Sequence, residues 1–445
     1  MAIAGTCAWH TLPNEMKLAV VESLEINDAK TFSKVDIRTY RICVPTTFKR
    51  VKLSSLEQLH SFLENVPRAY CQNIQDLDVS TQEDQCSEVG SYHQQAKAEA
   101  VISLLVASPR LIKLALRLAG SSDKSIIVPF INLSELKHLT IANCNKEEHS
   151  PLSERLVVSI AASARSLEYL SLDNIARSAM HAPECVGVYP YVPLVTGDDD
   201  IPDHPSLGSE LSLPSLLRLP TLKTLIIRDT HLGDQRWATT PVACQLKVLD
   251  LGSCYHESED FNRICTERIM GAVGRTIDEF SLATAVSDTG FATPSVTPLP
   301  RLRKLHISPF FPVDSVVDTM TTLAGSPIET LSMQCYEDDV VDVCAALQDF
   351  LSVRVERGAG FYDKLKRIDV CVAANDDSTH DAEEREERIE ATKRLLDFCR
   401  DLRLASVVCK AVAESALLHG HYPLGQLRHA YDKKISAHVI GRALL

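Results

Sequence analysis

Long apolar runs are absent from this sequence of 445 residues, and their absence excludes a large class of proteins. The longest apolar stretches are short, such as residues 100–107, which Ser103 interrupts. Because a membrane-spanning helix needs about 18 consecutive apolar residues, we expect no contact with a membrane. The first ten residues also lack a basic segment followed by an apolar one, so no secretory signal peptide is expected. These absences predict an intracellular protein, cytoplasmic or nuclear.

Positively charged residues are also fewer than negatively charged ones. The chain has 46 Lys and Arg against 59 Asp and Glu, a net charge of -13. A general nucleic-acid binder needs the opposite balance to neutralise phosphates, so we expect no nucleic-acid partner. The apolar fraction of 45% and the charged fraction of 24% are those of an ordinary globular protein.

Motifs of catalysis and of metal binding are missing too. The 14 cysteines contain no C-x-x-C pair and are interpreted as buried thiols. The pair His419 and His421 has no neighbouring residues that would complete a tetrahedral metal site. No glycine-rich phosphate loop, H-E-x-x-H or G-x-S-x-G occurs. We therefore expect no metal, no cofactor and no catalytic residues, although an enzyme with unrecognised motifs stays open.

What the sequence does contain is a repeat. A six-residue frame, L-x-x-L-x-L with aliphatic or aromatic exchanges, recurs ten times, mostly at intervals of 24 to 37 residues. Between several copies, apolar residues recur at helical spacing, as in residues 94–107, 154–164, 313–323 and 340–351. Such a strand-and-helix unit cannot bury its apolar face alone, so the copies must stack into a curved solenoid. The frames begin at Ile74, Leu111, Leu136, Leu167, Leu222, Leu246, Ile277, Leu302, Ile328 and Leu365.

This pattern resembles leucine-rich repeats. Cys144 and Cys254 follow their frame starts by eight residues, and Thr230 stands at the same place in another copy. The resemblance implies that such small polar side chains satisfy backbone groups of the neighbouring turn. Other copies depart from the pattern, so we predict an irregular solenoid. The interval of 55 residues after Leu167 is rich in Pro, Gly and Asp, and it predicts a mobile loop insertion over residues 176–215 that leaves the solenoid.

The first 53 residues follow another pattern. Met16, Val20 and Leu24 lie on one face of a helix that begins near Pro13. A second helix is expected to be capped by Asn27 or Asp28, and a third is expected to end near Val44, where Pro45 follows. Three helices in about forty residues form a marginal core, and an apolar face left over would seek a partner.

This segment resembles an F-box, which opens with Leu-Pro-x-Glu, here Leu12 to Glu15. The closing residues 45–62 are similar to those of fungal F-box proteins that carry degenerate leucine-rich repeats. The resemblance implies docking on a Skp-type adaptor, which links the chain to a cullin–RING ubiquitin ligase. The implied contacts are Leu12, Pro13, Glu15, Met16, Val20, Leu24, Phe32, Val35, Val44 and Pro45. The alternative for about half of these residues is that they hold the three helices together.

The expected architecture is therefore an α/β protein: a three-helix F-box (residues 1–53), an irregular leucine-rich-repeat solenoid with a curved parallel sheet (54–400), and a C-terminal cap (401–445). The predicted function is that of the substrate receptor of an SCF-type ubiquitin ligase. The alternative is a repeat scaffold whose F-box does not act in a ligase. An exposed apolar patch on the first helix would favour the receptor.

A protein substrate would bind on the concave sheet face, where the residues that alternate with the frame point. The charged residues at these positions are five cations and six anions, among them Asp76, Asp78, Lys113, Arg117 and Asp369. A mixed face suits recognition of one protein surface without naming it. The candidate contacts are His138, Tyr169, Asp173, Arg228, Asp250, Glu279, Lys304, His306 and Arg367. The acidic run 376–390 is interpreted as the solvated face of a helix over 383–399.

Overall fold

The computed structural model describes residues 8–83, 94–145, 150–183, 194–253, 259–287, 298–358 and 360–373, with residues 390 and 393. The expected C-terminal cap, the acidic run 376–390, Cys254, His419 and His421 lie outside the described residues, apart from Glu390.

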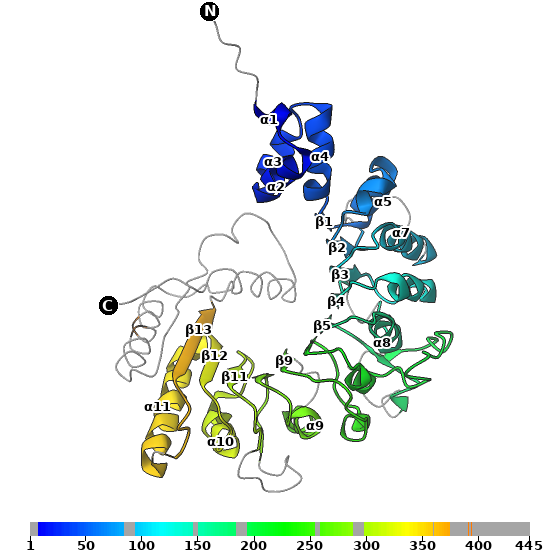
Figure 1. Ribbon diagram of the computed structural model, residues 1–445. Helices are drawn as coiled ribbons and strands as arrows, with labels where there is room; N and C mark the ends of the chain where they lie inside the picture. Colours follow the sequence, from blue (N-terminus) through cyan, green and yellow to red (C-terminus); the bar gives the residue numbers. More distant parts are fainter. Residues whose placement is uncertain are drawn as a thin grey trace, which may run out of the picture.

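The body of the protein is a parallel sheet of eleven strands bent into an arc, with the strands on the inside and the helices on the outside (Figure 1). The order across the sheet is β1-β2-β3-β4-β5-β8-β9-β10-β11-β12-β13, and every neighbouring pair is parallel. The strands are β1 (Arg50–Leu53), β2 (Asp76–Ser80), β3 (Lys113–Leu118), β4 (His138–Asn143), β5 (Tyr169–Asp173), β8 (Thr224–Arg228), β9 (Val248–Ser253), β10 (Glu279–Leu282), β11 (Lys304–Ile307), β12 (Thr330–Tyr336) and β13 (Arg367–Ala373).

The ten predicted frames supply ten of these strands, in register. The second aliphatic of each frame pairs with the same position on the next strand, from Leu77 on β2 through Leu225 on β8 to Ile368 on β13. Every frame side chain is at most 3% exposed. Since successive residues of a strand point to opposite faces, one face of the sheet forms the core and the other lines the concave side. The repeat prediction is confirmed, and the chain forms a curved solenoid of strand-and-helix repeats.

The sheet begins four residues before the expected boundary. Strand β1 was assigned to the helical module, yet Val51 pairs with Leu77 and Leu53 pairs with Val79. Phe48, Val51 and Leu53 have the spacing of the frame with an aromatic residue at its first position, but the sequence analysis assigned them to the end of the F-box-like segment. The predicted irregularity is visible between β8 and β9, where the register shifts between Ile226 and Arg228.

The outer layer alternates α-helices with thinner 3-10 helices. The expected helices are present as α7 (Gln94–Ala107), α8 (Glu154–Ser163), α10 (Val316–Thr322, preceded by η6, Val313–Ser315) and α11 (Val340–Arg357, preceded by η7, Glu337–Asp339). The others are α5 (Leu56–Asn65), α6 (Arg68–Cys71), η1 (Lys124–Asn132), η3 (Leu213–Arg218), η4 (Gln235–Ala238) and α9 (Glu259–Val273). Helices need about 8–10 Å between axes and strands only about 4.8 Å, so the stack curves with the sheet inside. Within the described ranges, no helix is long and apolar enough to cross a bilayer.

Small polar side chains join neighbouring turns, as the resemblance implied. Thr230 accepts a hydrogen bond from the backbone N–H of Ile175 (3.1 Å). In another copy this role belongs to Asn143, one residue before the predicted Cys144. The side-chain oxygen of Asn143 accepts a hydrogen bond from the backbone N–H of Gly120 (3.1 Å). Burial raises the pKa of the Cys144 thiol to about 11, so it is an unreactive structural group.

The N-terminal module consists of α1 (Ala8–Thr11), α2 (Asn14–Ser23), α3 (Ile26–Phe32) and α4 (Ile37–Thr47). Two expected helix ends were wrong. Helix α3 begins at Ile26, with Glu25 at the cap position, so Asn27 and Asp28 lie in its first turn. Helix α4 continues through Pro45 to Thr47. A proline costs a helix the hydrogen bond to the carbonyl four residues earlier, and here that residue, Arg41, is exposed to water.

The insertion was also predicted wrongly in its described parts, residues 176–183 and 194–215. It does not leave the solenoid as a loop. Its short strands β6 (Arg177–Ser178) and β7 (Leu194–Val195) pair in parallel, and Ala176, Arg177 and Ser178 are at most 1% exposed. Farther along, Ile201, Leu207 and Leu211 join the main hydrophobic core. The count of Pro, Gly and Asp did not reveal these anchors, which are individual buried side chains.

Candidate protein-interaction surfaces

The helical module has a small closed core. Val21, Ala29 and Cys43 are fully buried, and side chains such as Trp9 and Phe32 pack around them. The indole N–H of Trp9 donates to the Thr39 hydroxyl (3.0 Å), and its ring meets that of Phe32 at 4.8 Å between centroids. Trp9 precedes the Leu-Pro-x-Glu motif at Leu12 to Glu15, so the motif did not identify it as part of the core.

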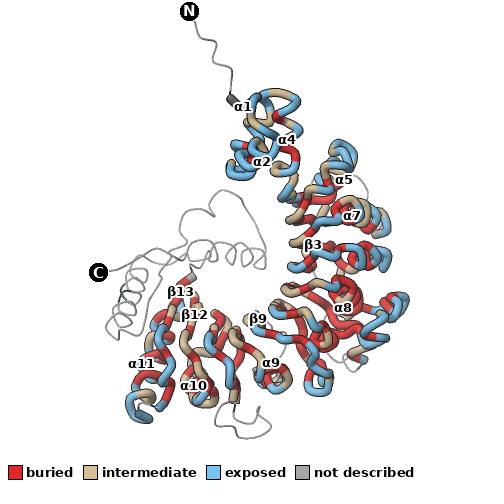
Figure 2. The backbone as a smooth tube through the Cα atoms, viewed as in Figure 1, coloured by how far each residue is buried: buried red, intermediate tan, exposed pale blue. Residues whose placement is uncertain are grey.

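Large apolar side chains remain on the outside of this module, and Figure 2 shows much of its surface as exposed. Met16 and Val20, one turn apart on α2, are 54% and 43% exposed. Ile26 begins α3, while Val35 and Ile37 flank the cap of α4; they are 39%, 65% and 66% exposed. We call these five residues the apolar docking face. Isolated exposed apolar residues are common. Here, however, five occur within 22 consecutive positions, and none of them belongs to the core of the module.

The remaining implied adaptor contacts divide by burial. Pro13, Glu15 and Pro45 are exposed, Leu12 is half-buried, and Val44 is buried. Leu24 and Phe32 are half-buried because they pack against the module's own core. Ile26 and Ile37 were not among the predicted contacts, since their exposure depends on how the three helices pack.

The module joins the solenoid through the end of α4. The Phe48 ring lies 5.2 Å from that of Tyr70 and 6.4 Å from that of Phe62, both centroid distances. Tyr40 also approaches Tyr70, and the hydrogen bond between their side chains raises the pKa of Tyr40. This junction leaves the apolar docking face uncovered.

The structure places all nine predicted substrate contacts on strands of the main sheet: His138 on β4, Tyr169 and Asp173 on β5, Arg228 on β8, Asp250 on β9, Glu279 on β10, Lys304 and His306 on β11, and Arg367 on β13. They alternate with the buried frame residues and therefore lie on the concave face. They are spread over much of the arc and do not form one compact cluster.

Most charges on this face neutralise one another. Arg228 contacts Asp250 (2.8 Å), and Arg367 contacts Asp369 (2.6 Å). Glu279 contacts both His306 (2.8 Å) and Lys304 (3.3 Å), and the hydrogen bond from His306 is the main cause that lowers its pKa. The His138 ring on β4 and the Tyr169 ring on β5 lie 5.4 Å apart on the same face.

Three cations at the N-terminal end of the concave face differ from the others. Arg50 and Lys52 on β1 and Lys113 on β3 are exposed, and none lies within ion-pair distance of a carboxylate among the described residues. Arg117 on β3 does have a partner, Asp78 at 3.1 Å. The sequence missed Arg50 and Lys52 because strand β1 itself was not recognised.

A second set of charges, which the sequence analysis missed, precedes the strands. Glu168 lies between Lys137 (3.8 Å) and Lys223 (2.7 Å) on the neighbouring repeats. Glu329 is placed in the same way between Arg303 and Lys366. These ladders are solvent-exposed and screened by salt, so they contribute little to stability.

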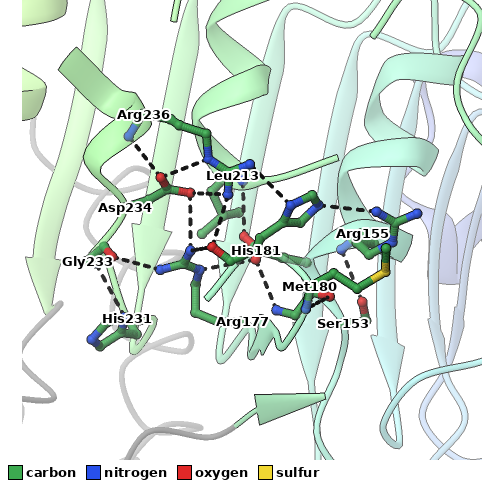
Figure 3. Close-up of polar contacts among 12 residues, drawn as sticks. Ser153, Arg155, Arg177, Met180, His181, Leu213, His231, Gly233, Asp234 and Arg236 are labelled. Atoms are coloured by element: carbon green, nitrogen blue, oxygen red, sulfur yellow. Dashed lines mark hydrogen bonds and ion pairs between the residues drawn. The ribbon is translucent and has the colours of Figure 1, made fainter. Parts of the chain in front are cut away.

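The insertion is anchored by a buried polar network, which we call the insertion clasp (Figure 3). Glu154 on α8 is 0% exposed; it accepts hydrogen bonds from Arg177 (3.1 Å) and from the N–H groups of Ser178 and Leu213. Arg177 also donates to the Gly233 carbonyl (2.9 Å) and to Asp234 (3.1 Å). The clasp thus ties α8, the insertion and the segment after β8 together.

A second half of the clasp surrounds Arg155 and Asp198. Arg155 donates to the backbone carbonyls of Asp198, Ile201 and Ser209 at 3.1–3.3 Å. The Asp198 carboxylate accepts from the hydroxyls of Ser153 (2.5 Å) and Ser178 (2.8 Å). Arg155, Arg177 and Arg236 are matched by Glu154, Asp198 and Asp234, so the clasp is neutral and structural in character. The signal that could have identified it is the adjacent Glu154-Arg155 pair within an otherwise apolar helix.

We expect His181 to make the stability of the clasp depend on pH. Its Nε2 lies 3.3 Å from Arg155 and its Nδ1 lies 3.1 Å from Arg236. Burial first, and then these guanidinium groups, lower its pKa to about 4. The unfolded state takes up a proton near the ordinary pKa of about 6.5. The free energy of unfolding should therefore fall as the pH drops from about 6.5 towards 4.

This prediction is checked by thermal unfolding at pH values across that window. The His181→Gln variant should show a smaller decrease in melting temperature on acidification than the wild type, since it has no imidazole to protonate. Equal decreases in the two proteins would contradict the assignment to His181.

The described residues form no group of three or more His, Cys, Asp or Glu side chains that could hold a metal ion. A cavity of about 300 Å³ lies beside α9 and α10 and is lined by residues that include Arg263, Ser287 and Asp318. Arg263 is paired with Asp260 (2.8 Å), and no histidine or cysteine joins the cavity lining to form a nucleophile and base pair.

Comparison with known proteins completes the description of these surfaces. Neither a protein family nor a curated protein matches this sequence. Among solved structures, the leucine-rich repeat-containing protein LegL7 from Legionella pneumophila is similar, with a TM-score of 0.37, 13% identity and coverage of 77% of this chain and 94% of that one. A TLR13–ssRNA13 complex is similar with a TM-score of 0.32, 12% identity and coverage of 73% and 41%. Both TM-scores are below 0.5, and the repeat architecture is established by the register of the chain's own frames.

Proposed function

We propose that this chain is a non-catalytic receptor that brings two proteins together. In this proposal the helical module docks on the Skp-type adaptor of a cullin–RING ubiquitin ligase, and the concave face of the solenoid binds a protein substrate. The observation that carries the proposal is the apolar docking face, which neither the core of the module nor its junction with the solenoid covers. A marginal helical domain that leaves five large apolar side chains in water is typical of a module that is completed by a partner.

The placement of the module supports the proposal further. It lies at one end of the arc, away from the middle of the concave face, so one surface can hold an adaptor while the other holds a substrate (Figure 1). Residues 1–49, which precede β1, carry six Lys and Arg against five Asp and Glu, so the module itself is nearly neutral and its net charge does not select a partner.

The test is capture of a purified Skp-type adaptor by the full-length chain. The Val20→Asp variant should weaken capture at least about tenfold, because a charge would be buried in an apolar interface. The matched control is Val355→Asp on α11, where the valine is 81% exposed at the other end of the solenoid. Both variants must keep the wild-type melting temperature. If the folded wild type fails to capture the adaptor, or if both variants weaken capture equally, the receptor proposal fails.

One alternative has an observation in its favour. Leu24, Phe32 and Val44, three of the implied adaptor contacts, take part in packing of the module or are buried. The protein would then be a leucine-rich-repeat interaction scaffold whose F-box-like module acts outside a ligase. Failure of adaptor capture, with substrate binding on the concave face retained, would support this second function.

A further inference from the structure

We infer that the N-terminal end of the concave face, on strands β1 to β3, binds an acidic segment of a partner protein. This inference rests on the proposed function, since it names the chemistry of the substrate that the solenoid would recognise. The surface consists of Arg50 and Lys52 on β1 and of Lys113 and Arg117 on β3. Asp76 and Asp78 lie on β2 between them, in register with the cations of β1.

The charges of this surface are not balanced. Four cations face two carboxylates, a local charge of +2 in a chain whose net charge is -13. Elsewhere on the described concave face, Arg228, Lys304 and Arg367 each lie within 3.3 Å of a carboxylate. Arg50, Lys52 and Lys113 have no such partner among the described residues, and all three are exposed. Carboxylates supplied by another protein would complete the pairing that the rest of the face achieves internally.

Protection of a sheet edge explains only part of this arrangement. Strand β1 is the first strand of the sheet, and charged side chains on an edge strand discourage unwanted pairing. Lys113, however, lies on β3 and is separated from the edge by β2. The positive charge of Lys113 also acts on His138 of the neighbouring strand β4. Burial is the main cause that lowers the pKa of His138, and the charge of Lys113 is the next.

The neighbouring side chains favour a peptide over a nucleic acid. Asp76 and Asp78 lie between the cations, where they would repel a continuous chain of phosphates. A peptide can place single carboxylates opposite single cations. Beyond Lys113, the small side chains Ala115 and Thr140 lie side by side in the register of β3 and β4, and they leave room for a backbone to approach.

The experiment measures binding of a fluorescent peptide of alternating Glu and Gly to the full-length chain at low ionic strength, where surface charge attractions are strongest. The same peptide with Gln in place of Glu is the ligand control. The Lys52→Glu, Lys113→Glu double variant should lower affinity for the acidic peptide by about tenfold or more. The control variant Lys247→Glu, Lys364→Glu makes the same change of net charge on exposed lysines elsewhere and should change affinity less than about twofold.

The results distinguish a surface for an acidic peptide from a nucleic-acid surface and from a face without a specific ligand. Absence of binding to the acidic peptide, equal binding of the Gln peptide, or equal losses in both double variants would overturn the inference. An oligouridylate of matched charge that binds more tightly than the peptide through the same lysines would also overturn it, in favour of a nucleic-acid surface. The Val20→Asp variant should bind the peptide like the wild type, so failure of adaptor docking and failure of this inference are distinguishable.

Discussion

Replacing Glu154 with alanine should destabilise the protein by about 3–5 kcal/mol, because it removes one of the two carboxylates that pair with the buried Arg177 guanidinium and leaves Asp234 as the other. Arg177 is 1% exposed, so water cannot take the place of the lost partner. The N–H groups of Ser178 and Leu213 lose their acceptor at the same time. The measurement is urea unfolding followed by circular dichroism, and it should show a lower midpoint.

The matched control is Glu168→Ala, which removes another carboxylate with two cationic neighbours, Lys137 and Lys223. These side chains are solvent-exposed, so the urea midpoint should stay within error of the wild type. Glu154→Gln retains a side-chain oxygen as acceptor and should fall between wild type and Glu154→Ala. If Glu154→Ala unfolds like the control, the insertion clasp is not a structural element.

Replacing Leu225 with alanine should be comparably severe, with a loss of about 2–5 kcal/mol from transfer and cavity terms. Leu225 is 0% exposed in the middle of the sheet, between Leu170 on β5 and Leu249 on β9. Both neighbouring strands would therefore line the cavity. Urea unfolding monitored by circular dichroism is again the measurement.

Its matched control is the next residue in the chain. Ile226 points to the concave face and is half-buried, so Ile226→Ala should shift the urea midpoint much less than Leu225→Ala. Equal effects at these two positions would mean that the register of β8 differs from the one described here.

Much of the solenoid could be predicted from the sequence because its repeat is a periodic pattern of burial. The spacing of residues such as Leu136, Leu139 and Ile141 determines which side of a strand enters the core, and this choice is local. The same holds for α11, whose buried Val340, Val343 and Leu347 follow helical spacing. The concave positions followed directly, since they alternate with the frame.

Other features were decided by tertiary structure, because they depend on which residues meet across the fold. Arg177 and Asp234 lie 57 positions apart, and no spacing rule brings them together. Strand β1 matches the frame only with an aromatic residue, Phe48, at its first position, and its pairing with β2 is what assigns it to the sheet. That Lys113 has no carboxylate partner among the described residues likewise depends on its neighbours on other strands. The sequence by itself determined the repeat, the curved sheet and its inner face; packing between distant segments decided the anchoring of the insertion, the exposure of the module's apolar residues and the location of unbalanced charge.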